Sequence, residues 1–164
     1  MRTALRRSHP EFDIRDDRYF MALALKEASD SFAQGGIPVG SVLVRAQTVI
    51  GQGHNQRVQM KNPILHGEMD CMTNAGRQRS YSGTALYTTL SPCMMCAGTI
   101  LQFKIPRVVI GENRNFGGNE EFLRSRDVEV IVMDDQDCTN LMRRFINERP
   151  EIWAEDIGHD WHNH

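Results

Sequence analysis

The sequence is sparse in several features that would assign it to a specialised class of protein. Four cysteines in 164 residues are too few for a disulfide-stabilised secreted scaffold. A formal net charge of −2 provides no general excess of positive charge for nucleic-acid binding, although a local basic patch is compatible with it. No apolar run approaches the length of a membrane span, and residues 1–7 lack the apolar core of a secretory signal. We therefore expect no membrane association, no nucleic-acid partner and a reducing, cytoplasmic location.

What the chain does contain is ordinary for a globular protein. Hydrophobic residues make up 40% and charged residues 24%, and the length suits one domain with a real core. We expect a loose arm at 1–15, a single domain at 16–158 and a polar tail at 159–164. Cys71 and Cys138 lie in apolar or helical patterns and are expected to be buried free thiols.

The pattern of apolar residues predicts alternating helices and strands. Helices are expected at about 16–34, 66–74, 93–103, 120–124, 136–148 and 152–157, with a loop at 56–65. Strands are expected at 39–45, around 49–50, 84–89, 107–111 and 128–133. The first two strands form a hairpin and the later ones follow helices, so the sheet should be mixed. The predicted fold class is α/β with a sheet of about five strands.

The strongest motif is split between His66-Gly67-Glu68 and Pro92-Cys93-Met94-Met95-Cys96. One imidazole and two thiols are ligands that Zn²⁺ prefers, and three protein ligands leave its fourth position open for water. Glu68 is then free to move protons beside that water. Both half-sites are predicted at helix N-termini, where the positive helix end favours the thiolate that binds zinc.

Other interpretations of this motif remain open. A structural zinc would take a fourth ligand from Cys71, Cys138 or another histidine, giving a binding module and no enzyme. A C-x-x-C pair alone also fits a redox centre, but that would leave His66 and Glu68 unexplained. The pair could also be two buried thiols beside a satisfied core histidine. The combination of H-x-E with P-C-x-x-C favours a catalytic zinc, as in the nucleobase deaminases.

Further short segments carry a resemblance to a known family. They are Gly-Gly-Ile-Pro-Val-Gly at 35–40, Gly-His-Asn at 53–55, Leu-His-Gly-Glu at 65–68, Leu-Tyr-Thr-Thr-Leu-Ser-Pro-Cys at 86–93, Gly-Glu-Asn at 111–113, Phe-Ile-Asn-Glu-Arg-Pro at 145–150, Trp153 and Glu-Asp-Ile-Gly at 155–158. On these segments the sequence resembles the fungal-type cytosine deaminases of the cytidine deaminase-like superfamily, over about residues 16–158. The zinc half-sites fit the whole superfamily, whereas the C-terminal segments single out the cytosine branch.

The resemblance implies a three-layer α/β/α sandwich, assembled as a homodimer, with one Zn²⁺ per chain. His66, Cys93 and Cys96 would be the zinc ligands and Glu68 the proton shuttle. Asn55 would hold the O2/N1 edge of a small nucleobase, Gly67 would donate from its backbone, and Ser91 and Asp156 would accept from the exocyclic amine. The remaining residues implied in the pocket are Phe116 and Trp153, as aromatic wall and lid, with Ile37 and Leu90.

Several of these residues also have structural interpretations. Asn55 suits a turn after Gly53, although its amide offers the donor and acceptor that a free base requires. Phe116 and Trp153 could be core residues, and Asp156 could cap a helix. The family tends to have an aromatic residue at the position of Val58, so the substrate range is the property most affected. The histidines at 159, 162 and 164 could suggest a metal site, but a solvated tail is favoured.

The function predicted from these residues is zinc-dependent hydrolytic deamination of free cytosine to uracil and ammonia. Zinc lowers the pKa of its water, hydroxide attacks C4, and Glu68 carries protons to N3 and to the leaving amine. The alternative is a deaminase of another small heterocycle, such as guanine or isocytosine, or of adenosine in tRNA. The net charge and the C-terminal segments weigh against the tRNA alternative.

Overall fold

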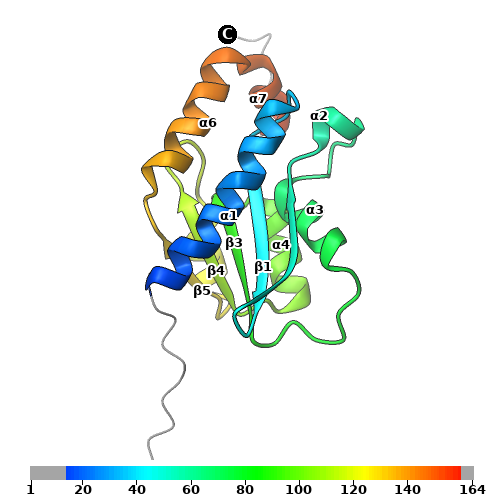
Figure 1. The fold of residues 1–164 in the computed structure, drawn as a ribbon, viewed down its shortest axis with the longest axis vertical. Helices are drawn as coiled ribbons and strands as arrows, with labels where there is room; N and C mark the ends of the chain where they lie inside the picture. Colours follow the sequence, from blue (N-terminus) through cyan, green and yellow to red (C-terminus); the bar gives the residue numbers. More distant parts are fainter. Residues whose placement is uncertain (1–13, 160–164) are drawn as a thin grey trace, which may run out of the picture.

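The computed structural model describes residues 14–159, and the expected arm before Ile14 and the expected tail beyond His159 lie outside them. The chain alternates helices with strands (Figure 1). In order the elements are α1 (Ile14–Ala33), β1 (Gly40–Arg45), β2 (Thr48–His54), α2 (Arg57–Met60), α3 (Gly67–Ala75), β3 (Thr84–Leu90), α4 (Met94–Phe103), β4 (Arg107–Glu112), α5 (Glu120–Arg124), β5 (Glu129–Val132), α6 (Gln136–Glu148) and α7 (Pro150–Asp156). No helix of the described part has the length and apolar character of a membrane span.

The five strands form one mixed sheet in the order β2-β1-β3-β4-β5. β1 pairs antiparallel with β2, its hairpin partner, and with β3. β3, β4 and β5 are parallel to one another, because α4 and α5 supply the crossovers that parallel strands need. The predicted mixed sheet of about five strands is confirmed.

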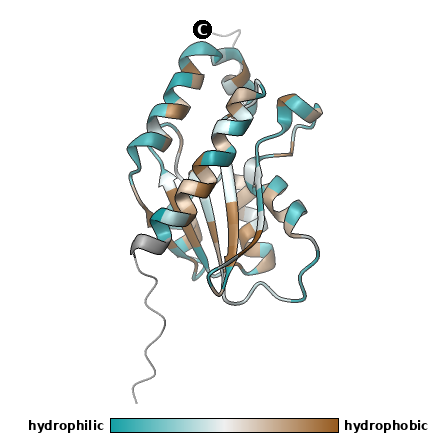
Figure 2. Ribbon diagram, in the orientation of Figure 1, coloured by the Kyte–Doolittle hydropathy of each residue, from teal (hydrophilic) through white to brown (hydrophobic). Residues whose placement is uncertain are grey.

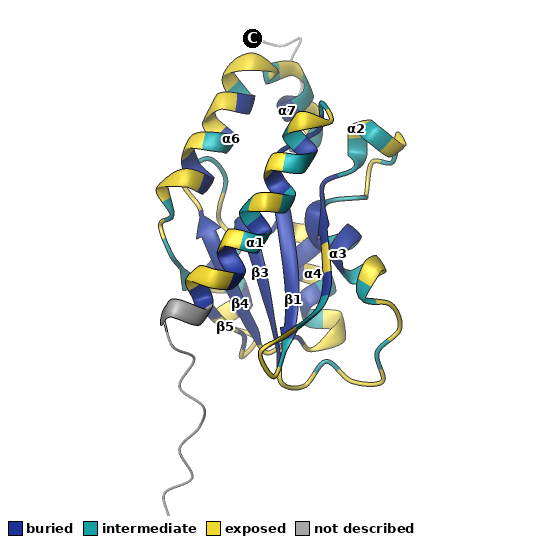
Figure 3. Ribbon diagram, viewed as in Figure 1, coloured by how far each residue is buried: buried dark blue, intermediate teal, exposed yellow. Residues whose placement is uncertain are grey.

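Successive residues of the central strands face opposite sides of the sheet, and each side has its own apolar cluster. Figures 2 and 3 show the strands as the apolar, buried centre, with helices whose polar sides face outward. One cluster joins β1 and β3 to α1 and contains Val42, Val44 and Tyr87. The other contains Leu43 and Leu86, with residues of α3, α4 and α5. Helices therefore cover both faces, which confirms the three-layer α/β/α arrangement.

A third apolar cluster lies beyond the strand ends that lead into the site. It contains Ile37, Leu90, Phe145 and Trp153, among others, and brings α6 and α7 over this end of the sheet. Figure 1 shows α6 and α7 at the same end of the molecule as α2. A pocket is therefore expected at this end of the sheet, between the strand ends and these helices.

β2 lies unusually close to α3, at two glycine positions. A Cβ added at Gly53 would lie 2.5 Å from Asp70 Oδ2 and 2.6 Å from the Cys71 nitrogen. A Cβ at Gly51 would lie 2.6 Å from Ala75 Cβ. Glycine at these positions therefore permits a backbone approach that no side chain would allow.

The boundaries differ from prediction in three places. α1 begins at Ile14, two residues before the expected start. β2 runs as far as His54, so Gly51 and Gly53 lie inside the strand and do not end it. The expected loop at 56–65 contains the single-turn helix α2, which has no buried residue and no side-chain cap, and so carries no pattern by which to predict it.

Candidate active site

Two helix N-termini converge on one point and place the half-sites of the motif together. His66 is the N-cap of α3 and Cys93 the N-cap of α4, both with extended backbone. The Cys93 thiol accepts a hydrogen bond from the Cys96 backbone nitrogen at 3.5 Å, so it also caps its own helix. Both half-sites lie at the positions predicted from the sequence.

The donor atoms of His66, Cys93 and Cys96 suit one tetrahedral zinc. His66 Nδ1 lies 3.5 Å from Cys93 Sγ and 3.8 Å from Cys96 Sγ, and all three atoms lie within 4.8 Å of one another. Ordinary zinc–nitrogen and zinc–sulfur bonds at tetrahedral angles place such donors about 3.6 Å apart. Among the described residues this is the one cluster of metal-ligating side chains that meets these distances.

The pKa values of the two thiols of the cluster are shifted in opposite directions. The hydrogen bond from Cys96 and, against burial, that from His66 lower the pKa of Cys93 to about 4. The pKa of Cys96 is raised well above its usual value, first by Cys93 and then by burial. For His66 burial favours the neutral ring, but Asp156 and Cys93 outweigh it and raise its pKa to about 10. Zinc binds a neutral imidazole and thiolates, so its binding displaces the protons that these pKa shifts favour on His66 and Cys96, while the lowered pKa of Cys93 already favours its thiolate.

Glu68 lies in the first turn of α3, buried beside the thiols. Thr88 Oγ1 donates to its Oε1 at 3.0 Å, and Cys96 Sγ donates to its Oε2 at 3.2 Å. Burial raises the pKa of the Glu68 carboxyl, because a low dielectric disfavours its charged form. A carboxyl group that gains and loses a proton readily is what a shuttle requires.

Asp156, from α7, contacts the second nitrogen of the predicted zinc ligand His66. Asp156 Oδ1 lies 3.0 Å from His66 Nε2 and 3.2 Å from Arg57 Nε. Arg57 Nε also donates to the Pro63 carbonyl at 3.0 Å. The chain end is thereby tied both to the metal cluster and to the α2 segment.

A cavity of about 590 Å³ opens directly onto the cluster, within the usual range for a small-molecule site. Nine of the predicted site residues line it: Asn55, His66, Glu68, Leu90, Ser91, Cys93, Phe116, Trp153 and Asp156. Cys96 and Gly67 lie behind this lining, in the helix starts. Ile37 is fully buried in the apolar cluster beneath, and Val39 lines the cavity in that region.

Asn55 is held rigidly at the end of β2. Its backbone nitrogen donates to the Val39 carbonyl at 2.8 Å, and its carbonyl accepts from Ser31 Oγ at 2.7 Å. Its Oδ1 accepts from the Arg57 backbone nitrogen at 3.0 Å, the turn contact that the sequence allowed. Asn55 therefore lines the cavity and makes the turn as well.

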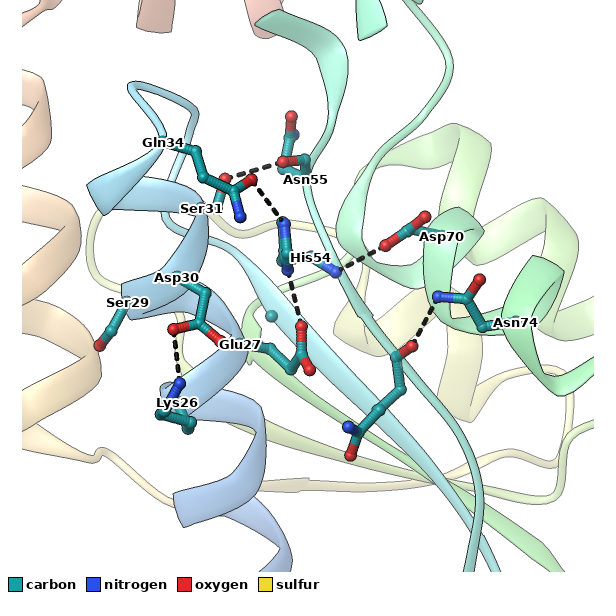
Figure 4. Close-up of polar contacts among 12 residues, drawn as sticks. Lys26, Glu27, Ser29, Asp30, Ser31, Gln34, His54, Asn55, Asp70 and Asn74 are labelled. Carbon is teal, nitrogen blue, oxygen red and sulfur yellow. Dashed lines mark hydrogen bonds and ion pairs between the residues drawn. The ribbon is translucent and has the colours of Figure 1, made fainter. Parts of the chain in front are cut away.

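The neighbouring His54 fastens this strand end to α1 and α3 (Figure 4). His54 Nδ1 lies 2.6 Å from Glu27 Oε2 and Nε2 lies 3.1 Å from Gln34 Oε1. The His54 backbone nitrogen donates to Asp70 Oδ2 at 3.0 Å. The matching segment Gly-His-Asn contains this histidine, but no role was assigned to it from the sequence, because its partners lie on other elements.

The aromatic wall and its support come from the loop after β4. Phe116 meets Trp153 edge to face, with ring centroids 6.1 Å apart. Glu112 is fully buried and accepts from Asn115 Nδ2 and from the backbone nitrogens of Arg114 and Asn115. Glu120 accepts from the Ser91 hydroxyl at 2.9 Å. Neither glutamate was assigned a role from the sequence, although Glu112 lies in the matching segment Gly-Glu-Asn at 111–113.

The fold and the site together define a zinc-dependent deaminase. The chain belongs to the cytidine and deoxycytidylate deaminase family, because the model of that family's zinc-binding region matches residues 14–112. It is similar to a cytosine deaminase of Candida albicans, at 50% identity over 146 residues, 87% of this chain and 97% of that protein. A tRNA-specific adenosine deaminase of Streptococcus pyogenes serotype M18 is 34% identical over 152 residues, 85% of this chain and 96% of that one.

Solved structures resemble the chain as well. One, from a study of A-to-I editing by tRNA:A34 deaminases, is 28% identical with a TM-score of 0.63, covering 70% of this chain and 97% of that one. A guanine deaminase from Nitrosomonas europaea shares the fold, with a TM-score of 0.68 at 18% identity, covering 88% of this chain and 97% of its own. The zinc site, one per chain, thus agrees with the family and with the His-Cys-Cys cluster.

Proposed function

We propose that the chain catalyses hydrolytic deamination of free cytosine to uracil and ammonia. The observation that carries this is one cavity lined by Glu68 and by His66 and Cys93 of the His66-Cys93-Cys96 cluster. The 50% identity to a cytosine deaminase over nearly its whole length supports cytosine as the base. The tRNA-specific relatives are more distant in sequence.

His66, Cys93 and Cys96 hold the zinc, which when bound supplies an activated water near neutral pH. Glu68 accepts a proton from the attacking water and delivers it to N3, which makes C4 more electrophilic. Glu68 then takes the second proton from the oxygen that has bonded to C4 and passes it to the amine. The C4–N bond breaks, so water and cytosine become ammonia and uracil. Thr88 orients the Glu68 carboxyl for both transfers through its 3.0 Å hydrogen bond.

The rest of the cavity binds and encloses the ring. Asn55 takes the O2/N1 edge, because its position is fixed and its amide offers both a donor and an acceptor. Gly67 donates from its backbone, while Ser91 and Asp156 accept from the amine at C4. Phe116 forms the wall, Trp153 covers the ring, and Ile37 and Leu90 support them from the apolar cluster. Val58 lies partly exposed on α2, outside the cavity lining.

We further propose a cytoplasmic homodimer, as the family resemblance implies. Size-exclusion chromatography with light scattering tests the dimer. The proposed location agrees with a site built from two reduced cysteines and with the buried free thiols Cys71 and Cys138.

An ammonia-release assay tests the activity. Zinc-loaded protein is compared on cytosine, cytidine, isocytosine, guanine and adenine, and cytosine is expected to give the highest kcat/KM. Higher turnover of guanine or adenine would replace cytosine by that base. A tRNA substrate would instead be revealed by salt-sensitive tRNA binding, because phosphate contacts weaken as salt rises.

A further inference from the structure

Both hydrogen-bond donors of Ser91 point away from the cavity that the residue lines. Its backbone nitrogen donates to the Glu112 carbonyl at 3.0 Å, and its hydroxyl donates to Glu120 Oε1 at 2.9 Å. Ser91 is buried, with 3% of its surface exposed. Its remaining polar capacity consists of the lone pairs on its hydroxyl and carbonyl oxygens.

The direction of the hydroxyl proton follows from the charge of Glu120. Its second oxygen, Oε2, accepts from the Gly118 backbone nitrogen at 2.8 Å. Burial alone would raise the pKa of this carboxyl, but the backbone hydrogen bonds and the Ser91 hydroxyl together lower it. An ionised carboxylate only accepts hydrogen bonds, so the Ser91 hydroxyl must donate to it.

We propose that Glu120 is a positioning residue that makes Ser91 an acceptor-only wall of the pocket, and so favours a ring that bears an amine over one that bears a carbonyl. Deamination converts an N–H donor on the ring into a carbonyl acceptor. An acceptor-only residue therefore attracts the amine of the substrate and opposes the oxygen of the product. This inference rests on the proposed deamination. It identifies Glu120, acting through Ser91, as the residue that makes the pocket prefer the substrate to the product.

Glu120 also fastens the loop that carries Phe116, through Gly118, and a test must separate the two effects. Loss of loop support weakens every ligand, whichever group it bears. Loss of the acceptor-only state changes the ratio of carbonyl to amine dissociation constants. That ratio is the diagnostic measurement.

The experiment uses zinc-loaded full-length protein carrying Glu68→Gln, so that cytosine is bound without turnover. Calorimetry gives Kd for cytosine and for uracil with and without Glu120→Gln. A glutamine cannot accept from both Ser91 and Gly118, which frees the Ser91 hydroxyl to donate into the pocket. The ratio of Kd for uracil to Kd for cytosine is expected to fall about tenfold. The reason is that the uracil oxygen would accept a hydrogen bond from Ser91 where it otherwise meets a second acceptor.

Glu121→Gln is the matched control, because the neighbouring Glu121 side chain is 85% exposed and pairs with Arg124 on the surface of α5. Glu121→Gln should change the uracil-to-cytosine ratio of Kd by less than about twofold, which is a smaller effect than that of one hydrogen bond. Repeating Glu120→Gln in a Ser91→Ala background removes the hydroxyl, and there the ratio should barely change. If Glu120→Gln fails to load zinc, Glu120→Asp takes its place. The shorter side chain moves the carboxylate away from Ser91 by one methylene, so the uracil-to-cytosine ratio of Kd should fall by less than is expected for Glu120→Gln.

An unchanged ratio in the Glu120 variants, with both ligands weakened equally, would overturn the inference and leave Glu120 as loop support alone. A fully additive effect in the Ser91→Ala background would overturn it too. If the wild-type protein deaminates another ring and not cytosine, the proposed function fails, and the same ratio is measured with that ring and its carbonyl product. The two failures therefore give different results.

Discussion

His66 Nε2 lies 3.0 Å from Asp156 Oδ1, which joins the start of α3 to the last helix of the domain. A metal-binding histidine is oriented by the partner of its other ring nitrogen, and such partners strengthen the metal site. Asp156, which the family resemblance implies as a substrate contact, is thus placed to act on the metal ligand as well.

Replacing Asp156 by asparagine should therefore weaken zinc binding about 10- to 100-fold, the usual effect of losing such a partner. Competition with a chromophoric chelator measures the zinc affinity. Glu155→Gln is the control, because the Glu155 side chain is 68% exposed and approaches Arg57 only at 3.7 Å. Equal zinc affinities in the two variants would show that Asp156 does not support His66.

Glu68→Gln should retain zinc and the fold but lose nearly all turnover. Glutamine has a similar shape and can still contact Thr88, yet it cannot carry a proton. Metal analysis and ammonia release are measured on the same preparation. Turnover within about tenfold of wild type, a barrier change of only about 1.4 kcal/mol, would exclude the shuttle role.

Asn55 should distinguish the free base from the nucleoside. Cytidine carries a ribose at N1, which removes the N1–H and collides with the asparagine, so kcat/KM should strongly favour cytosine. Asn55→Ala should lose most cytosine activity and most of that preference, because an unpaired buried group costs about 1–3 kcal/mol. Asn74→Ala is the control, since Asn74 is exposed on α3, donates to the Gln52 carbonyl and lies outside the cavity lining. Equal kcat/KM for base and nucleoside in wild type would contradict the role.

Acid stability should depend on Asp17. Arg107 holds both its oxygens at 2.9 Å, and Tyr87 donates to it at 2.7 Å. Burial opposes the charge, but these contacts outweigh it and lower the pKa of Asp17 below its ordinary 3.8. The ionised side chain therefore adds stability above about pH 4, and this is lost as the pH falls through the folded-state pKa.

Asp17→Asn should accordingly cost about 1.5–3 kcal/mol at pH 7, because Arg107 loses the carboxylate that it contacts through two hydrogen bonds and keeps its ion pair with Glu129 at 3.2 Å. The cost should shrink steadily below pH 4, where the wild-type carboxyl is protonated too. Urea unfolding at pH 7, 5 and 3 measures it. Asp134→Asn, which breaks the exposed pair with Arg114, should show a much smaller pH dependence, because solvent screens that pair.

The parts of the molecule that sequence could predict are those that local spacing encodes. His66 and Glu68 stand two residues apart and Cys93 and Cys96 three, so each half-site is one helical turn whatever surrounds it. The short apolar run at 39–45 likewise predicts a strand, and in the structure Val42, Leu43 and Val44 face the two apolar clusters in turn.

The parts that sequence could not predict depend on contacts between distant segments. Glu120 reaches Ser91 and Asp156 reaches His66 only after the sheet and its helices have assembled. Ile37 belongs to a matching segment, but its side chain packs beneath the cavity because the chain turns inward before β1. Matching segments identify a family, whereas packing decides which of their residues face the ligand.

The close contact of β2 with α3 has a consequence for the alignment of the groups that act on the substrate ring. Asn55 continues from the end of β2 and Glu68 stands at the start of α3, so the two groups that would act on opposite edges of one ring are spaced by backbone packing at Gly51 and Gly53. A displacement of about 1 Å between such groups can slow a reaction about a hundredfold. One methyl group added at Gly53 would thus misalign Asn55 and Glu68 with respect to the ring, although it touches neither substrate nor metal.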